Sequence, residues 1–234
     1  MKLKHIVIIP ASGSGSRFGG KTPKQFLKLP PHSKEVIFYT LKKFNDLKII
    51  DEIIISTNPI YFSKVKKIVS ENKLNKVKTI VSGGETRQQS VFNALSLLKK
   101  YSDKDKIIIH DAVRPFISVK KLKELISISH NYKSIVPALK INDTIKKIDS
   151  KGYIIDSIDR ENIWRIQTPQ IFDYSVISMS LIKAKQIDFT GTDESSVVMK
   201  FGGKVKICDG EITNIKITTK EDLKKIDYNK LLIT

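Results

Sequence analysis

The sequence has little cysteine and no long apolar run. Its only thiol, Cys208, excludes an intrachain disulfide framework and a cysteine-based metal site. No segment reaches the roughly 18–20 uncharged apolar residues that a membrane-spanning helix needs. Met1–Pro10 has a short apolar run but no small-residue cleavage site, and it leads straight into a Gly-rich turn, so it indicates a core strand and not a signal peptide. We therefore expect a soluble cytoplasmic protein without a membrane partner.

Acidic residues are also scarce, with 24 of them against 42 basic residues and a formal net charge of +18. Such a charge is typical of nucleic-acid-binding proteins, which form the alternative class here. The lysines are scattered without a long basic run, aromatic residues make up only 8 %, and no recognition helix or stacking platform is evident. We expect no nucleic-acid partner, and instead a lysine-rich surface that attracts anionic substrates.

Arginine is rare among the basic residues. Its planar fork binds phosphate or carboxylate in a bidentate way that lysine cannot copy, so a few arginines among many lysines are candidates for geometric roles. There are five, of which the first four fall within the motifs below: Arg17, Arg87, Arg114, Arg160 and Arg165.

The chain has ample material for a core, because 40 % of its residues are hydrophobic. Apolar β-branched runs alternate with segments of helical spacing, which predicts an α/β fold with a Rossmann-like, mostly parallel sheet and helices on both faces. The length fits a single domain over residues 1–234. The strands expected first are His5–Pro10, Ile53–Thr57, Val77–Val81, Ile107–His110 and Ser134–Leu139. The helices between and after them are expected at Glu35–Phe44, Tyr61–Lys73, Arg87–Lys100, Val119–His130, Asp173–Gln186 and Asp193–Phe201.

One segment breaks this alternation. Residues 143–160 alternate apolar and polar side chains on both sides of Ser150-Lys151-Gly152, which predicts a β-hairpin. The hairpin is too short for a core of its own, so we expect an arm over about 141–162 that packs on a partner or protrudes. After the later helices, we expect strands at Lys204–Cys208 and Asn214–Thr218 and a helix from Lys220.

The first strand runs into a loop of small residues, Pro10 to Gly19, that carries Arg17. Small residues after a strand let backbone N–H groups approach a phosphate closely. The loop lacks the Gly-Lys-Ser/Thr end of a Walker motif. It also has Phe18 where a dinucleotide fingerprint needs a third glycine, which disfavours an NAD-dependent oxidoreductase. Arg17 and Lys24 would bring two fixed cations to one triphosphate and stabilise charge during transfer of a phosphoryl group.

Two further motifs follow later strands. Gly83 and Gly84 open a helix with Ser90 in its first turn, which suits either a base-and-ribose site or a plain helix cap. Asp111 follows the fourth strand at the edge where open α/β sheets bind ligands, so it is placed to hold Mg²⁺ beside a triphosphate. For His110, we favour a hydrogen-bonded structural role over that of a catalytic base.

A second anion site is indicated by polar residues late in the chain. Arg160 ends the hairpin, Lys216 lies in an expected strand, and Thr192 precedes a helix that it could simply cap. Asp159 and Arg160 could equally form a surface ion pair of little energetic value.

These segments together resemble the bacterial 2-C-methyl-D-erythritol 4-phosphate cytidylyltransferases of the non-mevalonate isoprenoid pathway. The resemblance runs in order from residue 9 to about 223 and rests on PASGSGSRFG with PKQF, GGETRQQSV, HDAVRP, NDTIK, DRENIWRIQTPQIF, GTDESSV and NIKITTKEDL. It implies a fold of the nucleotide-diphospho-sugar transferase type and transfer of a cytidylyl group from CTP to a sugar-alcohol phosphate, with Mg²⁺ and release of pyrophosphate.

The resemblance also implies roles by position. Arg17, Lys24 and Lys216 would be catalytic, and Asp111 would hold the metal. The residues implied for CTP are Ala11, Ser12, Gly13, Gly15, Gly83, Gly84, Glu85, Ser90, Asp111 and Ala112. Those implied for the acceptor phosphate are Arg114, Thr144, Arg160, Thr192 and Lys216. The family's hairpin arm crosses to the other subunit of a homodimer, so Thr144 and Arg160 would complete the partner's site.

The sequence departs from the family pattern at a few places. Ser12 replaces a usual alanine, Glu85 a common aspartate, and Pro30-Pro31-His32-Ser33 a tighter turn with glycine. A ribitol 5-phosphate cytidylyltransferase remains the alternative, since it shares the CTP loop and the HDAVRP segment. The acceptor-side segments around Thr144, Arg160 and Thr192 favour the methylerythritol enzymes.

Overall fold

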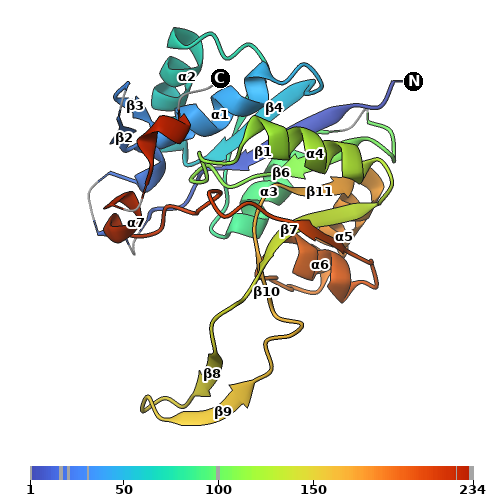
Figure 1. Cartoon of the computed structure of the whole chain (residues 1–234). Helices are drawn as coiled ribbons and strands as arrows, with labels where there is room; N and C mark the ends of the chain where they lie inside the picture. Colours follow the sequence, from blue (N-terminus) through green and yellow to red (C-terminus); the bar gives the residue numbers. More distant parts are fainter. Residues whose placement is uncertain are drawn as a thin grey trace.

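The computed structural model describes residues 2–15, 18–19, 22–30, 32–98, 101–224 and 226–231. Within them, eight strands form one twisted sheet in the order β10-β7-β11-β6-β1-β4-β5, with β12 beside β7 (Figure 1). The strands are β1 His5–Pro10, β4 Glu52–Thr57, β5 Val77–Ser82, β6 Lys106–Ile109, β7 Ser134–Lys140, β10 Trp164–Ile166, β11 Gln170–Asp173 and β12 Lys206–Asp209. Two short pairs lie off this sheet: β2 Lys28–Leu29 with β3 Lys34–Glu35, and β8 Ile145–Ile148 with β9 Ile154–Ile158.

Helices cover both faces of the sheet, as the alternation in the sequence predicts. The longer ones are α1 Val36–Asp46, α2 Phe62–Glu71, α3 Arg87–Leu95, α4 Val119–Ser129, α5 Tyr174–Gln186 and α6 Glu194–Lys200. Short helical turns occur at η2 Lys24–Phe26, η3 Pro59–Tyr61, α7 Lys220–Lys224 and η4 Tyr228–Leu231.

Two hydrophobic clusters follow from the two-residue period of the strands. Val7 and Ile9 of β1 pack on one face, in the cluster that includes residues of α1, α2 and α4. Ile6 and Ile8 pack on the other face with residues of α3, α5 and α6. Each of these four side chains is fully buried, because neighbouring side chains on a strand point to opposite faces. The central strand is therefore apolar along its whole length, and its loop is held on a rigid base.

The direction of the strands determines where ligands can bind. β1 pairs in parallel with β4 and β6, and β4 pairs in parallel with β5. The carboxyl ends of these four strands therefore meet at one edge, and the loops after β1, β5 and β6 lie together there. β11 runs antiparallel between β6 and β7, so its first residue, Gln170, lies near this edge.

Three details correct the sequence prediction. The strand expected at Asn214–Thr218 is wrong: the segment is irregular and pairs with no strand in the described part of the chain, and Ile217 N donates to Val113 O in the loop after β6 at 3.0 Å. The helix expected to reach Lys100 ends at Leu95, where Ser96 Oγ bonds back to Phe92 O and tight turns follow. The antiparallel strands β10 and β11 were not predicted.

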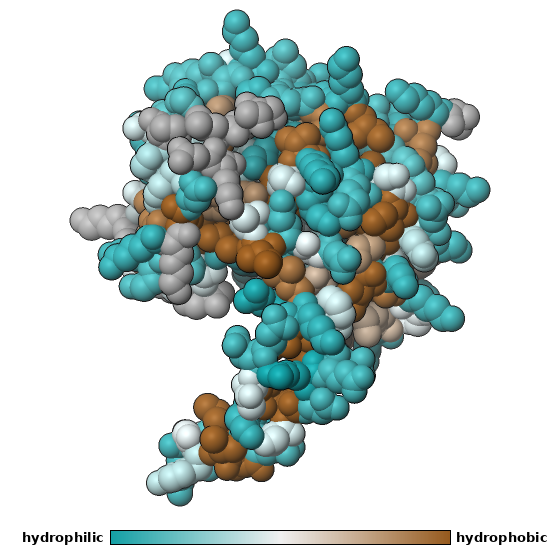
Figure 2. All heavy atoms as spheres, in the orientation of Figure 1, coloured by the Kyte–Doolittle hydropathy of each residue, from teal (hydrophilic) through white to brown (hydrophobic). Residues whose placement is uncertain are grey.

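β8 and β9 form the predicted hairpin, which extends from the body of the protein (Figure 1). Asp149 Oδ1 accepts from the backbone N–H groups of Lys151 and Tyr153 at 2.9 Å each, and Gly152 adopts φ 89°, which closes the turn. Figure 2 shows apolar atoms gathered on this arm. Its large exposed hydrophobic residues are Ile148, Tyr153, Ile154, Ile155 and Ile158. A two-stranded hairpin with exposed apolar side chains is marginally stable by itself and needs a cover.

Among the described helices, none has the length and apolar character required to cross a bilayer.

Candidate active site

A cavity of about 520 Å³ lies at the carboxyl ends of the parallel strands. The loops after β1, β5 and β6 contribute most of its wall, together with η2 and the segment that carries Lys216. Eleven residues singled out from the sequence line it: Ala11, Ser12, Gly13, Gly15, Lys24, Gly84, Glu85, Ser90, Asp111, Ala112 and Lys216. Motifs that are more than 200 residues apart in the chain thus share one hollow.

The loop after β1 is held in place by a side chain that the sequence reasoning did not single out. Gln25 is buried and donates from Nε2 to Ala11 O at 2.8 Å and Gly13 O at 3.0 Å. Gly15 adopts φ +74°, and a Cβ at this position would lie 3.5 Å from Lys24 N. Only glycine takes this conformation readily, and its turn brings Lys24 beside the loop. The predicted catalytic residue Arg17 lies outside the described residues.

The loop after β5 is held by Ser90 and packs on Ser12. Gly84 N donates to Ser90 Oγ at 3.0 Å, whereas Thr86 provides the helix cap by accepting from Gln89 N at 3.0 Å. A Cβ on Gly83 would lie 1.6 Å from Ser12 Oγ, so only glycine fits between the two loops. Gly83 is adjacent to the cavity but does not line it. The helix cap that the segment could provide is therefore present at Thr86, while the Ser90 side chain holds the glycine loop; the base-and-ribose site stays a prediction.

Asp111 is the most heavily bonded carboxylate in the cavity. Its Oδ1 accepts from Arg87 Nε at 3.0 Å, and its Oδ2 accepts from Arg114 Nε at 3.2 Å and Lys216 Nζ at 3.0 Å. Burial by itself would raise the pKa of Asp111, but the charges of Arg87, Lys216 and Arg114 together hold that pKa well below its usual range. Asp111 is therefore ionised at neutral pH.

His110 supports Asp111 from inside the protein. Asp111 N donates to Thr168 Oγ1 at 3.1 Å, and Thr168 Oγ1 lies 3.0 Å from His110 Nδ1. His110 Nε2 lies 3.1 Å from Arg114 O, which can only accept, so the proton is on Nε2 and Thr168 donates to Nδ1. Burial lowers the pKa of His110 to about 4, so the ring is neutral. This agrees with the structural role that the sequence favoured.

Arg114 and Lys216 reach the site from two crossing segments. Arg114 Nη1 donates to Asn214 O at 2.8 Å, and Asn214 Nδ2 donates to Thr168 O at 2.7 Å. These bonds fix the irregular segment that follows β12 and direct Lys216 onto Asp111. Arg114 touches the cavity only through Asp111 and does not line it.

Arg87 and Glu194 were quoted within motifs but given no role. Arg87 Nη1 donates to Glu194 Oε1 at 2.6 Å and Oε2 at 2.5 Å, and only 1 % of the Glu194 side chain is exposed. The charges of Glu194 and Asp111 outweigh the effect of burial and raise the pKa of Arg87, so it stays charged. The scarcity of arginine in the sequence was the signal that made Arg87 a candidate for a geometric role.

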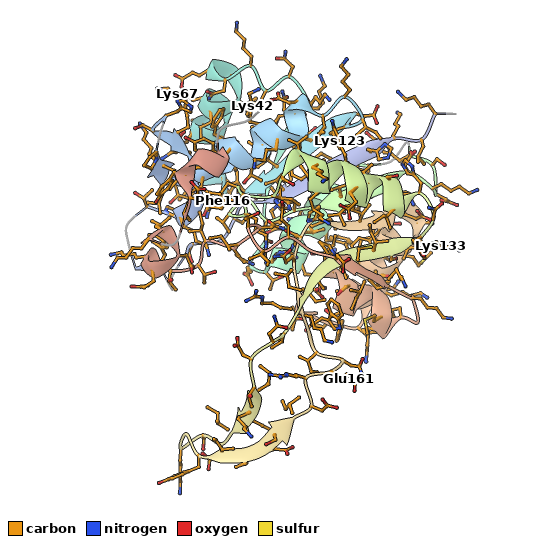
Figure 3. The ribbon with its side chains drawn as sticks, in the orientation of Figure 1. Lys42, Lys67, Phe116, Lys123, Lys133 and Glu161 are labelled. Carbon is orange, nitrogen blue, oxygen red and sulfur yellow. The ribbon has the colours of Figure 1, made fainter. Side chains whose placement is uncertain are left out.

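The remaining acceptor candidates do not join the cavity. Thr144 and Arg160 lie on the arm and Thr192 lies before α6, and all three side chains are exposed. Arg160 Nη1 donates to Asn142 O, and both residues line a shallow hollow at the root of the arm with Glu161. Figure 3 shows Glu161 there, away from the sheet. Within one chain the acceptor residues are therefore split between the body and the arm.

No cluster of three or more His, Cys, Asp or Glu residues that could hold a metal occurs in the described part of the chain. Asp111 is a single carboxylate. An ionised carboxylate has about four lone-pair positions, two on each oxygen. Arg114 and Lys216 use the two positions on Oδ2 and Arg87 uses one on Oδ1, which leaves one position on Oδ1. One carboxylate position suits Mg²⁺, which usually takes one or two carboxylates and completes its shell with phosphate oxygens and water.

Comparison with known proteins identifies the family. A model of the 2-C-methyl-D-erythritol 4-phosphate cytidylyltransferases matches residues 5–229. The chain belongs to this cytidylyltransferase family. Its relatives of that name include the protein from Dictyoglomus thermophilum, 38 % identical over 222 residues and 94 % of both chains. The Syntrophus aciditrophicus relative is 38 % identical over 226 residues, which cover 95 % of this chain and 94 % of that protein.

Solved structures agree with this assignment. The 2-C-methyl-D-erythritol 4-phosphate cytidylyltransferase of Francisella tularensis superposes with a TM-score of 0.83 at 29 % identity, covering 98 % of this chain and 100 % of that one. The 4-diphosphocytidyl-2C-methyl-D-erythritol synthase of Anaerococcus prevotii gives a TM-score of 0.80 at 31 % identity, covering 95 % and 94 %. The family and the fold class predicted from the sequence are thus confirmed, and the ribitol 5-phosphate alternative is not favoured.

Proposed function

We propose that the chain transfers a cytidylyl group from CTP to 2-C-methyl-D-erythritol 4-phosphate, giving 4-diphosphocytidyl-2-C-methyl-D-erythritol and pyrophosphate. The observation that supports it best is the single cavity in which two glycine loops face Lys24, Asp111 and Lys216. Backbone N–H groups and fixed cations around one hollow suit a triphosphate. Family membership supplies the identity of the base and of the acceptor.

The CTP half of the site is assigned to the two glycine loops. Gly13, Gly15 and Lys24 would bind the triphosphate, together with Arg17. Gly83, Gly84 and Ser90 would hold the cytidine against Ala11 and Ser12, with Glu85 and Ala112 completing the pocket. Ser90 and Ser12 already fix the distance between the loops, so the base would meet a preformed slot.

Asp111 is the residue proposed to hold Mg²⁺, with CTP oxygens as further ligands. When bound, the ion would neutralise negative charge on the triphosphate. Lys216 is the most exposed of the three cations on Asp111, with 38 % of its side chain accessible, so it is the one best placed to turn toward a substrate phosphate.

The reaction needs no general base. An oxygen of the acceptor phosphate, which is already an anion at neutral pH, forms a bond to the α-phosphorus of CTP. The bond from that phosphorus to its bridging oxygen breaks, and pyrophosphate leaves with the electron pair. Lys24 and Arg17 would stabilise the charge around the α-phosphorus. Lys216 and Arg160 would hold the two anions together against their repulsion, while Arg114, Thr144 and Thr192 position the acceptor.

The arm is proposed to complete the site of a second copy in a homodimer. Its exposed apolar side chains include Tyr153 at 70 % and Ile154 at 65 % accessibility, which is unusual for a soluble monomer. The same arm carries Thr144 and Arg160, which in their own chain lie outside the CTP cavity. A partner would cover the apolar surface and receive both side chains in one step.

Pyrophosphate release with CTP and Mg²⁺ tests this function directly. We expect strong turnover with methylerythritol 4-phosphate and little with ribitol 5-phosphate. A preference for ribitol 5-phosphate would keep the CTP site but overturn the acceptor assignment. Release with neither acceptor would overturn the proposed function.

A further inference from the structure

Arg87 connects three segments of the site that are far apart in the sequence. It is the first residue of α3, directly after the proposed nucleoside loop. Its Nε bonds Asp111 after β6, and its Nη1 bonds both oxygens of Glu194 at the start of α6. Glu194 lies two residues after Thr192, a proposed acceptor residue. One guanidinium thus connects the CTP side, the proposed metal carboxylate and the acceptor side.

The two oxygens of Asp111 are not held equally. Oδ2 has two cationic partners, Arg114 and Lys216, whereas Oδ1 has Arg87 as its partner among the described residues. Contacts at Oδ2 alone would still let the carboxylate swing about that atom through coupled changes in the two side-chain torsions of Asp111. The bond from Arg87 Nε to Oδ1 is a second point of attachment, so it restricts this swing and with it the direction of the remaining lone pair on Oδ1.

Glu194 in turn fixes Arg87. The guanidinium is a planar fork, so a carboxylate held by Nη1 determines where Nε points. Glu194 is almost fully buried, and the hydrogen bonds at the start of α6 hold its backbone: Asp193 accepts from Ser196 N at 2.8 Å, and Ser195 N donates to Gln170 Oε1 at 3.0 Å. Glu194 is therefore a rigid anchor on the acceptor side.

We propose that Arg87 is a positioning residue for the cytidylyl transfer: held by Glu194, it orients Asp111 for the Mg²⁺–CTP complex and connects the nucleotide side to the acceptor side. This inference rests on the function proposed above. Two rival explanations exist. The Arg87–Glu194 pair could serve stability alone, or Arg87 could contact CTP itself, since Arg87 lines the cavity and its Nη2 is buried without a hydrogen-bond partner in the described part of the structure.

Three variants separate these explanations: Arg87→Gln, Glu194→Gln and the double variant. Arg87→Gln leaves the buried Glu194 carboxylate without its cation, so both the unfolding free energy and kcat should fall. The double variant removes both charges together, and its stability should return close to that of the wild type. If Arg87 orients Asp111, the double variant will still have a kcat about tenfold below wild type, with KM for CTP within about threefold.

A binding measurement complements the kinetics. Mn²⁺ binding in the presence of CTP and the absence of acceptor, followed by electron paramagnetic resonance, should be several-fold weaker in the double variant than in the wild type. Arg87→Lys keeps the positive charge but loses the planar guanidinium, so its kcat should also be lower than that of the wild type. Glu194→Gln still offers Arg87 an acceptor, so its kcat should fall less than that of Arg87→Gln.

A second buried ion pair, at the start of β6, serves as a matched control. Lys106 Nζ lies 2.5 Å from Asp173 Oδ1, in a buried ion pair at the far end of β6 from Asp111. Neutralising it with Lys106→Gln and Asp173→Asn should leave kcat and Mn²⁺ binding as in the wild type, even where stability changes.

Two results would overturn the inference in an active wild-type enzyme. Recovery of wild-type kcat in the double variant would show that the pair serves stability alone. A raised KM for CTP with unchanged kcat would make Arg87 a substrate ligand. A wild-type protein that releases no pyrophosphate would instead refute the proposed function, so the two failures are distinguishable.

Discussion

The two halves of the proposed site differ in how far one chain can build them. On the CTP side, Gln25 holds the loop after β1 and Ser90 holds the loop after β5, while Gly15 and Gly83 pack closely on Lys24 and Ser12. These contacts fix the glycine loops before any ligand binds. On the acceptor side, Lys216 lines the cavity and Arg114 bonds Asp111, but Thr144 and Arg160 are exposed on an arm that leaves the body. The loops proposed for CTP are thus held in place within one chain, whereas the residues proposed for the acceptor do not meet within one chain.

This difference indicates a division of tasks. Preorganised loops reduce the ordering cost of binding CTP, so nucleotide recognition should be a property of each chain. Acceptor recognition should depend on assembly of two chains. The predictions below test that division, from the largest expected effect to the smallest.

Lys24→Ala should give the largest effect, since it removes a fixed cation from the wall of the CTP cavity. We expect kcat to fall by roughly 10²-fold or more, which corresponds to a few kcal/mol of lost transition-state stabilisation. Steady-state kinetics will measure it, with Lys28→Ala, an exposed lysine of β2 outside the cavity, as the control. A near-normal kcat would remove Lys24 from the catalytic set.

Arg160→Ala should act on the acceptor and not on CTP. Losing a charge-assisted contact to the acceptor phosphate should raise KM for methylerythritol 4-phosphate by about tenfold, with a smaller change for CTP.

Mixing subunits tests where Arg160 acts. In a homodimer with crossing arms, half of the dimers formed by co-refolding equal amounts of Lys24→Ala and Arg160→Ala chains carry one intact site. At an acceptor concentration well below the KM of Arg160→Ala, where that variant alone has about a tenth of wild-type activity, the mixture should therefore reach about a quarter of wild-type activity. A mixture of Lys24→Ala with Lys216→Ala, both changed in the body, should restore nothing. If the first mixture gives no more activity than the average of its two components refolded alone, the arm serves its own chain.

Gly83→Ala tests the fit between the two CTP loops. The added methyl would lie 1.6 Å from Ser12 Oγ and 2.6 Å from Ser12 Cβ, so one loop must move. We expect KM for CTP to rise about tenfold while KM for the acceptor changes little. Gly13→Ala separates packing from ligand contact: its Cβ would meet no protein atom within 4 Å, so a rise in KM there would come from contact with CTP itself. An unchanged KM for CTP in Gly83→Ala would argue against a preformed slot.

Ser12→Ala should give the smallest effect. It deletes the bond from Ser12 Oγ to Ser56 O, which is 3.2 Å long, and restores the residue usual at this position in the family. The unfolding free energy in urea should fall by about 0.5–1.5 kcal/mol, and KM for CTP should stay within about threefold. A large rise in KM would mean that this hydroxyl contacts the nucleotide.

Sequence patterns predicted the central sheet well because burial on both faces leaves a strong signal. β1 was predicted with the ends that the structure has, and β4 and β6 to within one residue. Asn214–Thr218 gave a false strand, because its apolar residues pack on the core while its backbone bonds loops. β11 was missed because Gln170–Asp173 is only four residues long and lies inside a motif noted for its chemistry.

The site shows a similar limit. Sequence motifs identified Asp111, Lys24 and Lys216 as candidates: Lys24 follows the Gly-rich loop, Asp111 follows a predicted strand, and Lys216 lies in a motif of the family resemblance. The roles of Gln25 and Glu194 come from contacts with residues 14 and 107 positions away, for which a single sequence gives no local sign. Arg87 is an intermediate case. Its residue type made it a candidate in the sequence, but nothing in the sequence indicated that its partners are Asp111 and Glu194.

The charges around Asp111 also bear on the order of folding. Its three cations come from positions 87, 114 and 216, so the last of them joins only when the segment after β12 docks on the loop after β6. An intermediate without that segment would have the glycine loops but not the complete set of charges. CTP should therefore bind such an intermediate weakly and stabilise the completed fold in preference to it. Substrate would then act as a selective stabiliser of chains that have finished folding.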